Sequence, residues 1–208
     1  CLDETTLAYA RHPLSYMMEA ADDICYLILD MEDAHKRGIV ATEEIDNFFT
    51  SFYRKDETWF FERKDFIYKT VTDNNERMSF LRANAINKLV DCVSTVFIEN
   101  YDSIMDGTFQ NSLVHHLPNF ENNALSECRQ FSFRNIYKHP SVVKVELTGF
   151  NVIGELLDMF VQAALQPEKT YNKKLMSIIP DQFKNNGDDL YSRIQVVLDY
   201  ISNMTDLY

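Results

Sequence analysis

Three polar side chains that could do chemistry recur along the first helical stretch of the sequence. Asp22, Tyr26 and Asp30 are four residues apart, so a helix with about 3.6 residues per turn places them on one face. A carboxylate there can bind a divalent cation through oxygen, and a tyrosine one turn further can hydrogen-bond or stack with a ligand. A second aspartate can accept a hydrogen bond from a sugar hydroxyl. The spacing leaves open a simpler interpretation, in which the stripe faces solvent as most charged helix faces do.

The helix that must hold these residues is predicted to run from about Leu14 to His35. Pro13 suits its first turn and Gly38 follows its end, while His12 is expected to cap the helix rather than bind a metal. Apolar residues fill most of the remaining circumference, which predicts a helix buried on most sides with its polar stripe along water or a polar cleft. They are Leu14, Met17, Met18, Ala20, Ala21, Ile24, Cys25, Leu27, Ile28 and Met31.

The rest of the sequence predicts an all-α protein, arranged as one helical domain over residues 1–208. Gly and Pro occur only five times each, and long stretches repeat their apolar residues with helical periodicity. The alternating segment Val142–Leu147 fits a short strand, a helix or an extended linker equally well. The range 105–120 is ambiguous, and Asn185-Asn186-Gly187 is expected to form a turn before a helix capped by Asp188. Further helices are predicted over residues 42–53, 58–71, 77–101, 125–137, 150–165, 171–179 and 188–204.

Composition limits the classes of partner. A formal net charge of -12 argues against broad electrostatic binding of nucleic acid or of an anionic membrane. It does not exclude an anionic small molecule, because a local cluster of cations can overrule the global field. No apolar run is long enough to span a membrane and no signal peptide is visible. The four cysteines form no C-x-x-C pair, which is typical of a reducing compartment and predicts a cytoplasmic protein.

Three blocks of the sequence resemble a known family. The segment from Arg11 to Tyr26, continued over residues 28–34, resembles a signature of the bacterial dGTPase-like branch of the HD-domain phosphohydrolases. Residues 197–206 resemble the late "DYisgMTD" segment of that family. The segment Tyr137–Pro140, with Val143, Glu146 and Gly149, is similar to a third block. These blocks stand in the family's order and span nearly the whole chain.

The resemblance implies an HD-type helical bundle and a divalent metal, Mg²⁺ or Mn²⁺. In the family the metal is held by a His, a His-Asp pair and a later Asp, and the later Asp matches Asp22. The resemblance also implies that five residues bind the nucleotide substrate. These are Tyr26 and Asp30 on the sugar side, Tyr137 and Glu146 as a wall of the base pocket, and Arg193 as a phosphate ligand.

One departure from the family pattern is large, because the sequence contains no His-Asp dipeptide. We therefore expect the other metal ligands upstream of Cys1, in a longer polypeptide of which this chain is the C-terminal part. Asp22 alone cannot hold a catalytic metal, so the isolated chain is expected to be inactive.

The activity that the resemblance implies is hydrolysis of a deoxynucleoside triphosphate, with dGTP favoured, to the deoxynucleoside and triphosphate. Self-association into a homo-oligomer is also expected. Two alternatives stay open at this point. One is an HD-type nucleotide phosphodiesterase or nucleotidase, and the other is a non-catalytic helical regulatory module.

Two further clusters favour structural interpretations. His115 and His116 are adjacent, so on a helix they point in different directions, and surface or capping roles are favoured over a metal pair. The run Trp59-Phe60-Phe61 is predicted to lie in the core or in a subunit interface rather than to form a stacking platform for nucleic acid.

Overall fold

The computed structural model describes residues 9–183 and 189–205, and every regular element in these ranges is helical. The all-α prediction is therefore confirmed. Backbone contacts divide the chain into two compact units, Cys1–His139 and Pro140–Tyr208. The arrangement as one domain stays a prediction.

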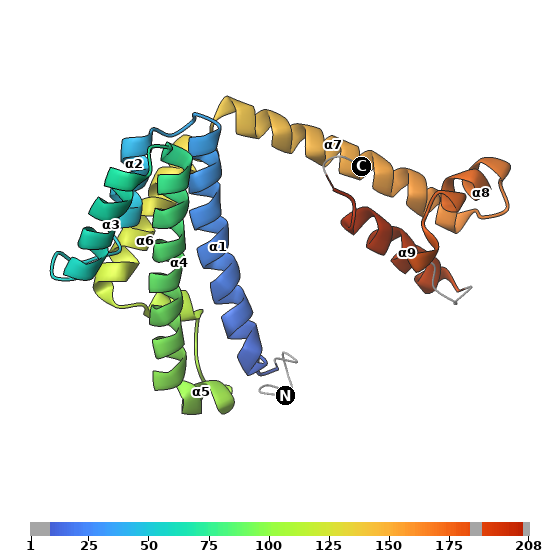
Figure 1. Cartoon of the computed structure of the whole chain (residues 1–208). Coiled ribbons are helices and arrows are strands. Elements are labelled where there is room, and N and C mark those ends of the chain that lie inside the picture. The colour runs from blue at the N-terminus through green and yellow to red at the C-terminus, as the bar shows by residue number, and fades with distance from the viewer. Residues whose placement is uncertain (1–8, 184–188, 206–208) are drawn as a thin grey trace. The chain divides into compact units, whose positions relative to one another are not determined.

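The first unit is built around two long helices that lie side by side, α1 (Pro13–Lys36) and α4 (Asn74–Glu99) (Figure 1). Helix α2 (Thr42–Thr50) packs on α4, and η1 packs on both long helices. The remaining elements of the unit are α3 (Thr58–Thr70), α5 (Tyr101–Met105), η1 (Leu113–His116), α6 (Asn119–Phe131) and the π-helical turn η2 (Ser132–Ile136).

Helix α1 begins and ends as its sequence predicts. The ring Nδ1 of His12 accepts a hydrogen bond from the backbone N–H of Leu14 at 3.2 Å, which confirms its role as a cap. Pro13 occupies the first helical position, where its missing N–H is not needed. After the helix, Gly38 adopts a φ of +70°, a left-handed conformation that glycine adopts without a steric penalty.

The core of the first unit lies between α1, α2, α3 and α4. Ile24, Ile28 and Met31 of α1 are fully buried. They share this core with Phe49, Phe52, Phe60, Met78, Leu81, Ala85 and Leu89. The prediction that this helix is buried on most sides is wrong for the N-terminal half of α1, because Leu14 and Met17 are exposed and Met18 is 74% exposed. Only one face of this half packs against the described residues, which leaves an apolar surface open.

The second unit consists of α7 (Pro140–Leu165), α8 (Thr170–Ser177), η3 (Asp181–Phe183) and α9 (Leu190–Ser202). Helices α8 and α9 both pack on α7. Its small core is formed by Phe160, Ala164, Ile179, Val196, Val197, Tyr200 and Ile201.

Residues 142–147 lie inside α7, so the strand that their alternation allowed is absent there. A strand needs a neighbouring strand to pair its backbone N–H and C=O groups, whereas a helix pairs them within the segment. The described residues offer this segment no strand partner. The helix expected over residues 125–137 begins earlier, at Asn119, and its last turn is the π-helical η2.

The expected turn at 185–187 and the expected cap Asp188 lie outside the described residues. Asp189 caps α9 instead, accepting a hydrogen bond from the backbone N–H of Ser192 at 3.1 Å. Among the helices of the described ranges, none combines the length and the apolar character that crossing a membrane requires.

Candidate functional site

Asp22 lies on the exposed side of α1, in a shallow open hollow of about 650 Å³. The hollow is lined by Arg11, Met18, Glu19, Ala21 and Asp22. The carboxylate of Asp22 makes no hydrogen bond or ion pair with another described residue, whereas Arg11 pairs with Glu19 at 2.7 Å. Asp22 is thus an available carboxylate beside a cation, at the edge of the open apolar surface around Met18.

Tyr26, Asp30 and Tyr137 come together although Tyr137 is 107 residues beyond Asp30. The Tyr137 hydroxyl donates a 2.9 Å hydrogen bond to Oδ2 of Asp30. The rings of Tyr26 and Tyr137 are 6.4 Å apart between centroids, with a tilt of 36°. Tyr26 is 63% exposed, so its ring is accessible to a ligand. Two blocks of the sequence therefore converge on one small polar cluster, which follows Asp22 along α1.

Burial and hydrogen bonding set the titration of this cluster. Partial burial raises the pKa of Asp30, the charge of Asp33 raises it further, and the hydrogen bond from Tyr137 lowers it in part. The pKa of Tyr137 is raised by burial and by its hydrogen bond to the Asp30 carboxylate. Tyr137 therefore stays a neutral donor that holds one oxygen of Asp30. The other oxygen of Asp30 remains able to accept a hydrogen bond from a ligand hydroxyl.

Tyr137→Phe should raise the pKa of Asp30 further, because it removes the hydrogen bond that lowers this pKa and keeps the ring beside Tyr26. Carbon-13 NMR titration of the aspartate carboxyls, with Asp30 assigned through Asp30→Asn, measures the shift. Tyr26→Phe is the matched control and should leave the Asp30 titration unchanged. An unchanged midpoint in Tyr137→Phe would contradict the hydrogen bond as the cause.

Glu146 and Arg193 belong to the second unit. Glu146 is an exposed residue of α7, and Arg193 is half-buried on α9. The Nε of Arg193 is buried and has no hydrogen-bond partner in the described part of the chain. The two residues stay predicted members of the nucleotide site.

The interpretation of the adjacent histidines as structural is supported by their contacts. His115 hydrogen-bonds the hydroxyl of Ser112 at 2.7 Å, and His116 lies 2.9 Å from the backbone carbonyl oxygen of Gln110. The two rings thus have different partners, and each holds the loop before or within η1.

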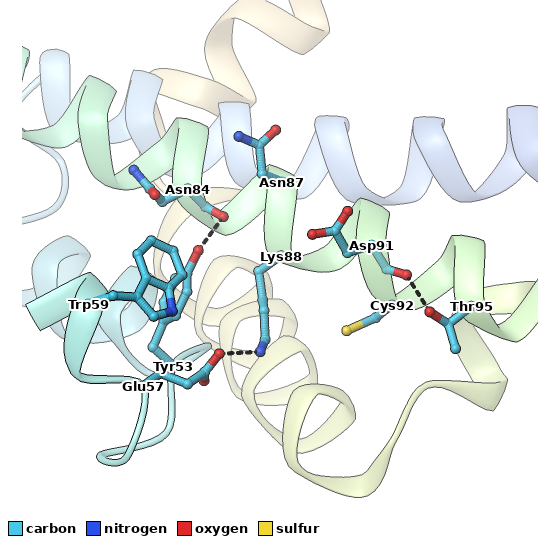
Figure 2. A pocket seen from close by; sticks show the side chains of 9 residues that line it. All are labelled: Tyr53, Glu57, Trp59, Asn84, Asn87, Lys88, Asp91, Cys92 and Thr95. Atoms are coloured by element: carbon cyan, nitrogen blue, oxygen red, sulfur yellow. Dashed lines mark hydrogen bonds and ion pairs between the residues drawn. The ribbon is translucent and has the colours of Figure 1, made fainter. Parts of the chain in front are cut away.

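Arg11 was not predicted to be a member of the Asp22 hollow, although Arg11 stands at the start of the family-like segment. A second pocket, lined by residues of α3, α4 and the loop before α3, was not predicted either (Figure 2). None of the residues predicted to bind a metal or a nucleotide lines that pocket. Its lining mixes an exposed tryptophan, two asparagines and several charges from two segments, so no local spacing identifies it.

The described residues do not form a complete metal site. They contain no group of three or more His, Cys, Asp or Glu side chains able to hold a metal ion together. A stable site for a divalent metal needs several ligands. This chain can therefore supply the Asp22 carboxylate, and further ligands must come from elsewhere if a metal binds there.

Comparison with known proteins supports the resemblance. Residues 115–208 match the phosphohydrolase-associated domain family. This match begins in η1 of the first unit and includes Tyr137, Glu146 and Arg193.

Curated relatives match nearly the whole chain. A deoxyguanosinetriphosphate triphosphohydrolase-like protein of Synechocystis is 33% identical over 96% of the chain, and one of Listeria monocytogenes is 31% identical over 95%. The deoxyguanosinetriphosphate triphosphohydrolase of Salmonella typhimurium is 26% identical over 96%. The chain spans only 43%, 47% and 47% of the lengths of these relatives. The chain is thus similar over nearly its whole length to a part of proteins named deoxyguanosinetriphosphate triphosphohydrolase or deoxyguanosinetriphosphate triphosphohydrolase-like protein.

Proposed function

We propose that the whole protein carrying this chain hydrolyses deoxynucleoside triphosphates, dGTP foremost, to the deoxynucleoside and triphosphate. The observation that carries the proposal is the face of α1 that holds Asp22, Tyr26 and Asp30. Tyr137, from a distant block of the sequence, contacts this face. The chain is also similar over nearly its whole length to proteins named for this activity. A nucleotide along this face would meet a carboxylate first, then an exposed ring, then a half-buried carboxylate.

Each residue has a role that its surroundings support. Asp22 would be one oxygen ligand of a Mg²⁺ or Mn²⁺ ion whose other ligands lie outside this sequence. When bound, such an ion polarises a phosphoryl oxygen and acidifies a coordinated water. Asp30, fixed by Tyr137, would accept a hydrogen bond from a hydroxyl of the deoxyribose.

The remaining assignments concern specificity and charge. The exposed ring of Tyr26 would lie against the sugar and leave no room for a 2′-hydroxyl. Tyr137 and Glu146 would border the base, and Arg193 would neutralise part of the triphosphate with its guanidinium charge. Self-association into a homo-oligomer is part of the same proposal, and light scattering that finds only a monomer of the whole protein would count against that part.

The test is a product assay with the full-length protein and Mg²⁺ or Mn²⁺, using the four deoxynucleoside triphosphates in parallel. We expect deoxyguanosine and inorganic triphosphate from dGTP, separated by anion-exchange chromatography. The 208-residue chain alone should release neither product, because its sequence has no His-Asp pair and its described residues form no group of three metal ligands. Release of pyrophosphate or single phosphates, or turnover of nucleoside monophosphates instead, would overturn the proposal in favour of a nucleotidase or phosphodiesterase.

A further inference from the structure

The pocket in Figure 2 lies between the start of α3 and the middle of α4, and we call it the α3–α4 pocket. Its volume is about 440 Å³, within the range of small-molecule sites. It is lined by Tyr53, Glu57, Trp59, Asn84, Asn87, Lys88, Asp91, Cys92 and Thr95. None of the residues proposed above to bind a nucleotide or a metal takes part in it.

The lysine of the pocket is already neutralised. Nζ of Lys88 lies 2.6 Å from Oε1 of Glu57 and 3.8 Å from Oε1 of Glu121. Arg54, the next cation, lies 3.3 Å from the other oxygen of Glu121. Lys88 is therefore unavailable to an incoming anion.

Asp91 adds a carboxylate that has no such partner. It is exposed, and its side chain makes no ion pair or hydrogen bond with another described residue. Asp91, Glu57 and Glu121 together carry three negative charges in and beside the pocket, whereas Lys88 and Arg54 carry two positive charges. Asn87, one helical turn before Asp91, likewise presents a free side-chain amide among the described residues. The pocket thus offers acceptors and a net negative charge.

The titration of two neutral groups in the wall agrees with a negative potential. Burial raises the pKa of Tyr53, and the charges of Glu57 and Asp91 raise it further. Burial also raises the pKa of the Cys92 thiol, with a further contribution from Glu121 that Lys88 opposes. Formation of an anion in this pocket is therefore disfavoured.

An aromatic wall stands opposite these acceptors. Trp59 is 54% exposed and packs edge-on against Tyr53, with ring centroids 5.6 Å apart. Tyr53 is itself fixed, because its ring stacks on Phe60 at 3.7 Å and its hydroxyl donates to the backbone oxygen of Asn84 at 2.8 Å. The prediction of a core or interface role for this aromatic run is confirmed for Phe60, which is fully buried. Trp59 instead presents its indole to the pocket (Figure 2).

We propose that the α3–α4 pocket binds a small aliphatic amine, with its ammonium group at Asp91 and Asn87 and its methylene chain on the indole of Trp59. An ammonium group forms charge-assisted hydrogen bonds with a carboxylate, and the apolar face of an indole ring packs against methylene groups. The pocket would exclude nucleotides, whose phosphates would meet the unpaired carboxylate of Asp91. This site is separate from the proposed triphosphohydrolase activity.

The test uses the 208-residue chain, in which Trp59 is the single tryptophan and its fluorescence reports on the pocket. Titration with the diamine putrescine should change the fluorescence saturably, and equilibrium dialysis should give the same dissociation constant. The neutral diol of the same length should have no effect. Asp91→Asn should weaken putrescine binding about fivefold, the size expected for a partly exposed ion pair.

Asp65→Asn is the matched control, because it removes the same charge from an exposed position of α3 outside the pocket. It should bind putrescine like the parent chain. Equal weakening in both variants would mean that only net charge matters and would overturn the proposal, as would the absence of a saturable response or tighter binding of dGMP than of putrescine. If Asp91→Asn loses helicity by circular dichroism, Trp59→Phe followed by dialysis replaces it, and undiminished binding there would also overturn the proposal.

Discussion

Replacing Asp22 with alanine is expected to slow dGTP hydrolysis by the full-length protein at least about 100-fold, because loss of a group that merely supports a metal ligand already costs about 10- to 100-fold. Folding should be unaffected. Asp22 is exposed and its carboxylate makes no hydrogen bond or ion pair with another described residue. The measurements are the rate of triphosphate release, the metal content of the purified protein and the helical content by circular dichroism.

The matched control for this prediction is Asp65→Ala, which removes another exposed aspartate, from α3. It should keep the parental rate and metal content. An Asp22→Ala variant that retains full activity would show that the metal assignment is wrong. Loss of activity with unchanged metal content would instead place Asp22 on the substrate side of the site.

The face of α1 could be predicted because it depends on local geometry. Helical spacing alone aligns Asp22, Tyr26 and Asp30, and the cap at His12 and the proline after it need no tertiary information. The same local reasoning failed for Leu14 and Met18, which are exposed. An apolar side chain favours burial, but the sequence does not show whether another described residue packs against it.

The contact between Tyr137 and Asp30 could not be derived from spacing. Both residues were predicted to bind substrate, yet their hydrogen bond depends on how α6 and the π-helical turn η2 bring a residue 107 positions away to α1. A π-helical turn accommodates one extra residue, so it rotates all the side chains that follow it. Helical periodicity of about 3.6 residues cannot foresee such a rotation.

Glu32 was missed although the sequence carried a signal for it. It lies four residues after Ile28 and eight after Ile24, and both of those side chains are fully buried. A glutamate in that register must be buried with a partner, because an unpaired buried carboxylate is too costly. Its partners are Ser79 and Arg82 on α4, about fifty positions later, which only the packing of α1 against α4 reveals.

Replacing Arg82 with methionine is expected to lower the free energy of unfolding of the 208-residue chain by about 3 kcal/mol at neutral pH, the lower end of the cost of breaking a buried ion pair. Glu32 is 1% exposed and lies 2.9 Å from Arg82. Its remaining partners are Ser79 at 2.9 Å and Lys36 at 3.3 Å, which keep the loss from being larger. Urea denaturation followed by circular dichroism measures the change.

Lys36→Met is the matched control, because Lys36 is a more exposed cation on the same carboxylate. It should cost under about 1 kcal/mol, as exposed ion pairs do. The double variant Glu32→Met with Arg82→Met should recover most of the lost stability, because it removes the uncompensated charge and keeps the volume filled. Equal losses in Arg82→Met and Lys36→Met, or no recovery in the double variant, would contradict this account.

The effect of Arg82→Met should also depend on pH in a defined direction. Burial tends to raise the pKa of Glu32, but the hydrogen bond from Ser79 and the charges of Arg82 and Lys36 outweigh it, so the pKa lies below its ordinary value of 4.5. A carboxyl with a lowered pKa in the folded state stabilises the fold above its unfolded pKa and loses this contribution as the pH falls through the folded pKa. The stability gap between the parent chain and Arg82→Met should therefore be largest near neutral pH. It should narrow as the pH falls to and through the lowered folded pKa of Glu32 in the parent chain, because Glu32 is then protonated in both chains and the charge that Arg82 compensates disappears.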